Sequence, residues 1–493
     1  MKKSLYILLM MVFVITSCND LQELDDNPNS VSQTPPQLLL TEIESNTFQV
    51  EGLSPLLASR MIVSTSGESS LQYYKWNRES FDDYNRLRNV TKMIEEAKRV
   101  NNPVYEALGK FFRAYYFYNL TLRFGDIPYS EALQGEKENI YAPAYDPQEA
   151  VFEGILTELE EANTLLKENN DVIEGDIIYT SDASQWQQLV NSFRLKVLMT
   201  LSNKVGETDI DIPARFASIA QSEPLIESIA DNGQMEFYDQ LGSRYGEYNS
   251  STYGSDIYVD STFIKRLQDR QDPRLFIYAN RTKNASEQGL STDNFDAYEG
   301  GNPIGQYGKN SDKAAAGNIS LVDLRYTEDP TNEPHVLLGY SELQFILAEA
   351  RLRGWINSSS AEAYYNEGVK ASFAFYNRYA EDYASYVDEQ AAAEYLQGPE
   401  VDFSAANTME EKIKRIALQK YLRSFLQGGW SLYFEQLRTG YPEFLQPQTG
   451  PPPTRWIYPQ SEYQNNNANV STAIERQFGS GNDGIRETPW WLK

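Results

Sequence analysis

The sequence predicts an all-α protein built from helical hairpins, with one loop-rich insertion and few short strands. Apolar residues recur every three or four positions in many segments, which is typical of helices with one buried face. Alternation of apolar and polar residues seldom lasts four positions, so strands are scarce. The 493 residues suffice for two or three cores or for one extended helical array.

The first seventeen residues have the pattern of a secretory signal. Lys2 and Lys3 precede an unbroken apolar run over Leu5–Ile15, which is too short to span a bilayer comfortably. The only cysteine of the chain, Cys18, follows small residues, and this arrangement resembles a bacterial lipoprotein signal. A plain signal with an accidental cysteine is the alternative. We expect residues 1–17 to be removed, Cys18 to be acylated, and the acyl chains to anchor the protein to a membrane.

Residues 18–36 read as a flexible tether, because they are rich in Asp, Asn, Pro and Ser and lack periodicity. The acidic residues directly after Cys18 fit either a surface-export signal of some Gram-negative lipoproteins or a solvated linker. Loss of two lysines with the signal takes the net charge from -27 to -29. Such a charge repels nucleic acid and anionic lipid, so we expect no nucleic-acid partner.

A single domain is expected over residues 37–493, and its first helical block over residues 37–205. The clearest helix lies within Tyr105–Leu133, where Gly125 can end a helix and Pro128 forbids its continuation. Its residues match the helix pattern of a tetratricopeptide repeat, with an ordinary buried helix as the alternative. The residues that match are Tyr105, Leu108, Gly109 and Phe112. Further helices are expected at 36–61, 81–99, 148–167 and 186–201.

Two loop regions carry aromatic side chains beside polar ones. The first, within 71–81, contains Tyr73, Tyr74, Trp76 and Asn77. The second is a loop-rich insertion over 206–335, and loops of this length in a compact protein are usually functional. Its candidate residues are Tyr245, Tyr248, Tyr253, Tyr258 and Tyr298. Aromatic rings stack on sugar C–H faces while amides bind hydroxyls, so we predict a carbohydrate site, unless the rings fold back into the core.

A second helical block is expected over residues 336–440 and a C-terminal loop region over 441–493. The expected helices lie at 336–350, 360–376, 410–427 and 430–437. The single histidine, His335, is expected as a polar residue at the start of an apolar helix.

The residues offer little for catalysis. One histidine, and no cysteine besides the acylated Cys18, exclude His/Cys metal clusters and histidine-based triads. No metal ion or other cofactor is expected. The seventy acidic residues could supply a glycosidase pair, and Glu342 and Glu349 lie on one helix face, but among core residues.

Several motifs, in order along the chain, resemble the SusD-like (SusD/RagB) family of nutrient-binding outer-membrane lipoproteins. They are Gly125–Leu133, the run from Gly175 to Leu195, Asp272–Leu275, Glu342–Ala350, Arg438–Pro442, Arg455–Glu462 and the final Trp490-Trp491. The resemblance covers essentially the whole chain. Leu437 stands where the family often has a second arginine, and Trp456 replaces a usual leucine.

The resemblance implies a curved helical scaffold and a non-catalytic lipoprotein on the outside of the outer membrane. It implies capture of an oligosaccharide or polysaccharide and its delivery to a SusC-like TonB-dependent transporter. A peptide or other non-carbohydrate nutrient is the alternative ligand, and a secreted glycoside hydrolase is a third possibility. The family motifs mark scaffold, so they assign no ligand-binding residue.

Overall fold

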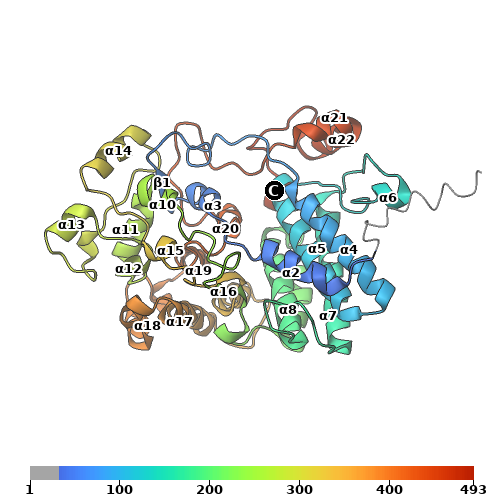
Figure 1. Ribbon diagram of the computed structural model, residues 1–493, viewed down its shortest axis with the longest axis horizontal. Helices are drawn as coiled ribbons and strands as arrows, with labels where there is room; N and C mark the ends of the chain where they lie inside the picture. The colour runs from blue at the N-terminus through green and yellow to red at the C-terminus, as the bar shows by residue number, and fades with distance from the viewer. Residues whose placement is uncertain (1–32) are drawn as a thin grey trace, which may run out of the picture.

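The computed structural model describes residues 33–493; the predicted signal, Cys18 and most of the predicted tether lie outside them. Helices α2, α4, α5, α7 and α8 gather at one end of the molecule, and α11, α12, α17 and α18 at the other (Figure 1). Helices α16 and α20 lie between the two groups. Within residues 33–493, no helix is long and apolar enough to cross a membrane.

The first helical block contains hairpins in which consecutive helices pack on each other: α4 on α5, α5 on α7, and α7 on α8. The predicted helix at 36–61 is two shorter helices, and a strand follows at Ile62, whereas the other helices match their predicted ranges within three residues. The elements are α2 Pro36–Thr47, α3 Leu53–Ala58, β1 Ile62–Ser64, α4 Asp82–Val100, α5 Pro103–Phe124, α6 Gly135–Glu138, α7 Gln148–Glu168, α8 Ala183–Thr200 and η1 Ser202–Lys204.

Helix α5 begins and ends where the sequence predicts. The Asn102 side chain accepts a hydrogen bond from the Val104 amide, and Pro103 occupies the first turn, where no intrahelical donor is needed. Gly125 ends the helix with a φ of 90°, which favours glycine. A Cβ at Gly109 would lie 2.4 Å from the Ile94 side chain, so glycine there permits the close approach of α4.

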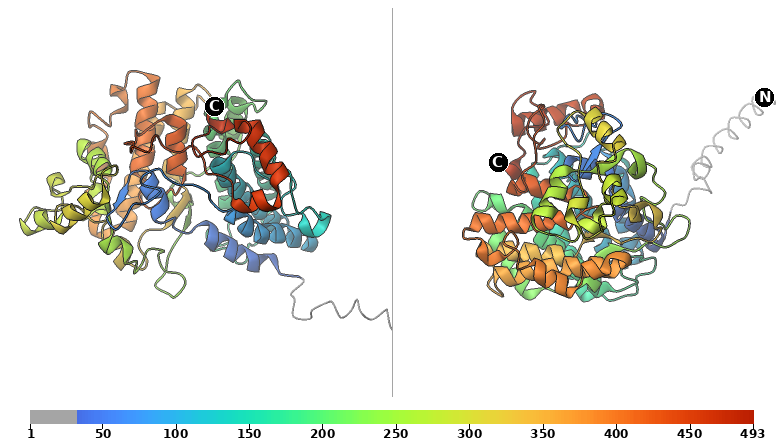
Figure 2. Two further views of the ribbon diagram at one scale, coloured as in Figure 1. Left: turned by 90° about the horizontal axis from the view of Figure 1, so that it is seen from above. Right: turned by 90° about the vertical axis from the view of Figure 1, so that its left-hand side faces the viewer.

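The segment after α5 joins the two ends of the chain. Asp126 accepts a hydrogen bond from the Gln148 amide at 2.8 Å and pairs with Arg476 at 2.5 Å. Its carbonyl accepts a hydrogen bond from the Tyr458 hydroxyl at 2.6 Å. The C-terminal helices therefore lie against the first block (Figure 2). These helices are α21 Gln460–Asn465, α22 Asn467–Phe478 and η6 Trp490–Leu492, so the expected loop region over 441–493 is partly helical.

The insertion over 206–335 is less loop-rich than predicted. Its first helix, α9 (Ile212–Ser222), packs on α8 and extends the first helical block. The remaining elements are short, and several are capped by their own Asp, Asn, Ser or Thr side chains. They are η2 Ile229–Asp231, β2 Gly233–Met235, α10 Thr252–Ser255, β3 Ile257–Val259, α11 Ser261–Asp269, α12 Leu275–Tyr278, α13 Lys283–Glu287, η3 Phe295–Ala297, α14 Tyr307–Ala315 and α15 Arg325–Glu328.

Two small antiparallel sheets tie the insertion to the helical blocks. Strand β1 pairs with β3, with Val63 opposite Tyr258. Strand β2 pairs with β4 (His335–Leu338), with Met235 opposite His335. The prediction that His335 starts a helix is wrong, because it opens this strand and is buried. Its Nδ1 lies 2.9 Å from the carbonyl oxygen of Phe48, an acceptor, so Nδ1 carries the proton.

The second helical block begins at Tyr340, four residues later than predicted. Helix α16 packs on α17 and α19, and it also contacts α8, which joins the two blocks. A Cβ at Gly368 would lie 2.7 Å from the Phe345 ring, so glycine there lets α17 pack closely on α16. The elements are α16 Tyr340–Leu352, α17 Ala361–Tyr379, η4 Glu381–Tyr386, α18 Glu389–Tyr395, η5 Phe403–Ala405, α19 Met409–Leu422 and α20 Ser431–Thr439.

Candidate ligand-binding site

Trp76 is packed inside the protein rather than held out to solvent. Its ring stacks on that of Trp456, with centroids 5.0 Å apart and 4° between the planes. The edges of Trp430 and Tyr433 close around it at 5.8 and 5.2 Å. Its indole N–H donates to the Arg455 carbonyl at 3.2 Å. We call Trp76, Trp430, Tyr433 and Trp456 the Trp76 cluster; it fixes the N-terminal loop to α20 and to the C-terminal segment.

The two tyrosines beside Trp76 also bind the loop to its surroundings. Tyr74 lies under the guanidinium of Arg60, which is 4.0 Å from the ring centroid, and its hydroxyl donates to the Ala58 carbonyl at 3.1 Å. The Tyr73 hydroxyl donates to the Gly305 carbonyl at 2.6 Å. Burial raises the pKa of both phenols. Both side chains are buried, so their hydroxyls serve the fold in this structure.

Three of the five tyrosines predicted in the insertion are buried as well. Tyr245 meets Phe237 edge to face at 5.3 Å, and Tyr298 stacks on Phe276 at 5.8 Å. Tyr253 is almost fully enclosed. Six of the nine predicted ligand-binding residues are therefore buried in this structure, in keeping with the alternative that the rings fold back into the core. The six are Tyr73, Tyr74, Trp76, Tyr245, Tyr253 and Tyr298.

The other three predicted site residues reach the surface. Asn77 is exposed, while Tyr248 and Tyr258 are half-buried. The Arg244 guanidinium lies 5.2 Å from the Tyr248 ring centroid. Burial, together with the charge of Asp256, raises the pKa of Tyr258. Ligand contact by Asn77, Tyr248 and Tyr258 stays a prediction.

Exposed apolar side chains gather where three loops meet, at residues 65–79, 302–309 and 443–450; we call this surface the loop face. Ile304, Tyr307 and Leu445 are 37%, 41% and 44% exposed. The loops are held together by the Tyr73 bond to Gly305 and by Arg60, whose Nε donates to the Leu445 carbonyl at 3.2 Å. In Figure 1 this face lies near β1, α3, α10 and α14.

A second surface, the aromatic depression, is hollowed between α11, α12, η3, η4 and α18, and its volume is about 600 Å³. Phe276 forms its buried centre, with Phe295 at 4.8 Å and Tyr386 at 5.3 Å between ring centroids. Phe295 and Tyr386 are each partly buried against the core and partly exposed. The lining residues are Asp269, Arg270, Gln271, Pro273, Phe276, Asp293, Phe295, Ser385, Tyr386, Ala391, Glu394, Tyr395, Gly398, Pro399, Glu400 and Val401.

The Asp272–Leu275 motif lies next to the aromatic depression, which it lines through Pro273. Arg274 pairs with Asp272 at 2.6 Å, and both side chains are fully buried. Arg274 also donates to Gln419 at 2.9 Å, and Gln419 donates to the Tyr395 hydroxyl at 2.8 Å. Buried polar groups with all these partners are rigid, so the motif holds the lining rings in place.

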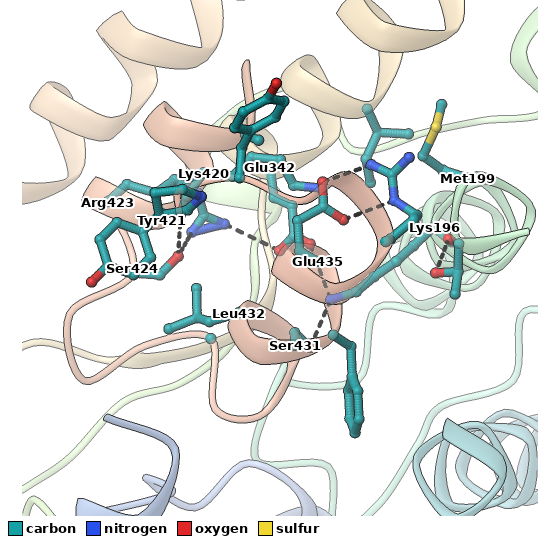
Figure 3. A pocket seen from close by; sticks show the side chains of 18 of the residues that line it. Lys196, Met199, Glu342, Lys420, Tyr421, Arg423, Ser424, Ser431, Leu432 and Glu435 are labelled. Carbon is teal, nitrogen blue, oxygen red and sulfur yellow. Dashed lines mark hydrogen bonds and ion pairs between the residues drawn. The ribbon is translucent and has the colours of Figure 1, made fainter. Parts of the chain in front are cut away.

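A much smaller cavity, about 40 Å³, lies where α8, α16, α19 and α20 meet (Figure 3). Glu342 is between Lys196 at 3.0 Å and Arg423 at 3.2 Å. Burial alone would raise the pKa of Glu342, but these two cations outweigh it and hold the pKa below its usual value. The volume suits a water molecule rather than a nutrient.

Glu349 lies seven residues further along the same face of α16, and its carboxylate is likewise paired with a cation. Arg438 binds both of its carboxylate oxygens, at 2.7 and 2.6 Å, and also pairs with Glu435 at 2.7 Å. Burial opposes ionisation of Glu349, but Arg438 prevails and the pKa lies below its usual value. Both carboxylates of the pair considered for catalysis are thus ionised parts of the junction between the helical blocks.

The sequence argument missed the depression. Phe295 and Tyr386 stand in the polar runs DNFDAYEGG and EDYASYVDE, the first of which also contains the predicted site residue Tyr298. Of the predicted site residues, Tyr298 lies nearest to the depression: it does not line the hollow, but its ring stacks on that of Phe276, the central ring of the depression. Ninety residues separate Phe295 from Tyr386, so only the fold brings them together.

Solved structures of similar proteins share this architecture over their full length. A SusD homolog from Bacteroides fragilis is 52% identical, with a TM-score of 0.90, and the match covers 94% of this chain and 100% of that one. A protein of Bacteroides vulgatus, proposed to lie in the outer membrane and to bind nutrients, is 48% identical, with a TM-score of 0.90 over 93% and 100% of the two chains. A second Bacteroides fragilis SusD homolog is 32% identical, with a TM-score of 0.87 over 93% and 100%.

No curated protein sequence matches the chain. A family model, SusD-like_2, described as "Starch-binding associating with outer membrane", matches residues 28–459. The match spans most of the chain, including both helical blocks and the insertion between them. The chain therefore belongs to the SusD-like family, as its motifs indicated.

Proposed function

We propose that this protein is a cell-surface lipoprotein that captures a glycan and delivers it to a SusC-like TonB-dependent transporter in the outer membrane, without changing the glycan chemically. The observation that carries the proposal is membership of a family described as starch-binding and associated with the outer membrane. Acylation of Cys18 would tether the domain beside its transporter.

The two hollowed or apolar surfaces supply the contacts that such a role needs. Partly exposed rings in the aromatic depression and Tyr307 on the loop face can stack on sugar C–H groups, and nearby polar side chains can bind hydroxyls. Each stacked ring contributes on the order of 1 kcal/mol, so several are needed for useful affinity. Tethering near the transporter raises the effective concentration of a weakly held ligand.

The state of the carboxylates favours binding over hydrolysis. A glycosidase needs one neutral carboxylic acid beside a carboxylate. Glu342 and Glu349 are buried, and cations hold the pKa of each below its usual value, so neither retains a proton near neutral pH. A secreted glycoside hydrolase would have to use another pair of acidic residues.

Ligand class is tested with pure protein against a panel of polysaccharides and peptides in affinity electrophoresis and calorimetry. We expect retardation by at least one glycan and no release of reducing ends. Absence of glycan binding at millimolar concentration, with binding of peptides, would replace the glycan by a peptide nutrient. Release of reducing ends that is lost on changing one carboxylate would establish a hydrolase.

Anchoring and partnership need the native membrane. We expect the protein to co-purify with a large β-barrel transporter from outer membranes. We expect Cys18→Ser protein to leave the membrane fraction, because its acyl anchor is missing. Recovery of the native protein without any such barrel would contradict delivery to a transporter.

A further inference from the structure

We propose that the aromatic depression is a binding site for neutral oligosaccharides and that it rejects polyanionic glycans. The inference rests on the proposed function and makes it more specific, because it assigns both a surface and a class of glycan. None of the residues that line the depression belongs to the Trp76 cluster or to the loop face.

The rings of the depression form an open, curved platform. Phe276 is buried, and it supports Phe295 at 49° and Tyr386 at 74° between the ring planes. Because Phe295 and Tyr386 keep part of their surface free, two ring surfaces at different tilts face the hollow. Successive units of a glycan chain also turn relative to one another, so a tilted pair of rings can follow them better than a flat pair.

The charges around the hollow select the ligand. Four exposed carboxylates line it, against one cation, Arg270, whose NH2 lies 3.7 Å from Glu400. Carboxylates accept hydrogen bonds from sugar hydroxyls, whereas uronate or sulfate groups would meet like charge, which costs free energy. The carboxylates are those of Asp269, Asp293, Glu394 and Glu400.

One hydrogen-bond donor at the edge of the hollow has no partner. The Nε of Arg270 is buried and lacks an acceptor among residues 33–493, although one terminal nitrogen of the guanidinium donates to the Arg266 carbonyl at 3.0 Å. A buried donor without an acceptor costs free energy. A water or a sugar hydroxyl that enters beside Arg270 would satisfy this donor.

The site is also prepared before a ligand arrives. The lining residue Tyr395 is held by Gln419, which also accepts from the buried Arg274 of the Arg274–Asp272 pair, so this part of the lining needs little ordering on binding. At about 600 Å³ the hollow has the size of ordinary small-molecule sites. An oligosaccharide, or one stretch of a polysaccharide, fits these dimensions.

The test is calorimetry of the full-length mature protein with neutral and charged probes. The neutral probes are maltohexaose and hexasaccharides of β-glucan, mannan and xylan; the charged probe is hexagalacturonate. Phe295→Ala and Tyr386→Ala are each compared with the unchanged protein, and Tyr386→Leu keeps the bulk but removes the planar ring. Tyr141→Ala, which changes an exposed tyrosine in the loop after α6, is the matched control.

We expect at least one neutral hexasaccharide to bind about fivefold more weakly to each depression variant, with no change for Tyr141→Ala. Hexagalacturonate should not bind the unchanged protein. The double variant Asp293→Asn/Glu394→Gln should bind it measurably, because two of the repelling carboxylates are neutralised. Thermal unfolding of each variant checks that it is folded. If Tyr386→Ala does not fold, Tyr386→Leu takes its place in the binding test.

Three outcomes would overturn the inference. Neutral-glycan binding that is unchanged in the depression variants but lost in Tyr307→Ala places the site on the loop face and leaves the proposed function standing. If hexagalacturonate binds as tightly as the neutral hexasaccharides, the depression does not reject polyanionic glycans. If no glycan binds the unchanged protein, both the inference and the proposed function fail, and peptide binding at the same rings would make it a peptide site.

Discussion

The Trp76 cluster and the aromatic depression both consist of aromatic side chains, but they differ in how much of each ring the rest of the protein covers. In the cluster, Trp76 is covered by Trp456, Trp430 and Tyr433, and its N–H already has an acceptor. In the depression, Phe295 and Tyr386 lean on one buried ring and keep a free surface. The rings of the Trp76 cluster are therefore covered by one another, whereas Phe295 and Tyr386 keep ring surface that a ligand can contact.

This difference shows what decides the role of an aromatic loop. Composition alone does not, because both regions lie in polar, aromatic sequence. The deciding quantity is how much of each ring other parts of the chain cover. A covered ring contributes to folding stability through the area it removes from water, whereas an open ring contributes when a ligand removes that area.

The largest expected effect is on the covered ring. Trp76→Ala should lower the free energy of unfolding by roughly 3–5 kcal/mol, because it leaves a large cavity among three other rings. Denaturation in guanidinium chloride measures this, and Trp76→Phe, which keeps part of the stacking, should lose less. A loss below about 1 kcal/mol for Trp76→Ala would mean that the cluster does not hold the loop.

A second region without free contacts is the ion-pair junction. Glu349→Gln should lower the free energy of unfolding by roughly 3 kcal/mol, since the buried Arg438 loses a bidentate carboxylate partner and keeps only Glu435, which also pairs with Lys420. The exposed Glu475→Gln is the matched control and should change stability by less than about 0.5 kcal/mol. The pKa of Glu349 lies below its usual value, so this stabilisation is present above the unfolded pKa of about 4.3 and disappears as the pH falls below it.

His335 gives a pH dependence of its own. Burial lowers its pKa to about 4, against about 6.5 in the unfolded chain, so the unfolded state binds the proton more readily between these values. Stability should therefore be complete above about pH 6.5 and should fall by roughly 1 kcal/mol between about pH 7 and 5.5. His335→Gln should flatten this slope.

The same pKa can be read directly by NMR, because the chain has one histidine. In protein without a histidine tag, a single imidazole signal should titrate with a midpoint of about 4. A midpoint near 6.5 would show that the ring is solvated and that strand β4 does not enclose it.

The smallest stability effects belong to the open rings. Phe295→Ala and Tyr386→Ala should each lower the free energy of unfolding by about 1 kcal/mol, because each ring is only partly removed from water. Guanidinium denaturation beside Trp76→Ala makes the comparison direct. Losses as large as that of Trp76→Ala would place these rings in the core and remove the contrast between the two regions.

The helical scaffold could be predicted because its signals are local. The buried face of α5 and its stop at Gly125 depend on neighbouring residues, and the structure matches both predictions. The division of residues 36–61 and the strand at His335 could not be predicted, because their partners lie far away in the sequence. Val259 pairs with Ile62, and Met235 with His335.

The residues of the candidate site were harder to predict than the helices, because their exposure depends on residues far away in the sequence. Whether Trp76 is exposed depends on Trp430 and Trp456, more than 350 residues later, and no local pattern reports this. Asn77, Tyr248 and Tyr258 do reach the surface, although nothing local distinguishes them from their buried neighbours. Two of the family motifs form buried ion pairs, which agrees with a scaffold role: Arg274 pairs with Asp272, and Arg438 with Glu349.

Hydrogen–deuterium exchange with and without a saturating neutral oligosaccharide tests the central claim most directly. The account predicts ligand-dependent protection in residues 293–298 and 383–401, around the open rings, and none in residues 72–77, where the rings are already covered. Protection at 72–77 with no change in the other two segments would contradict it.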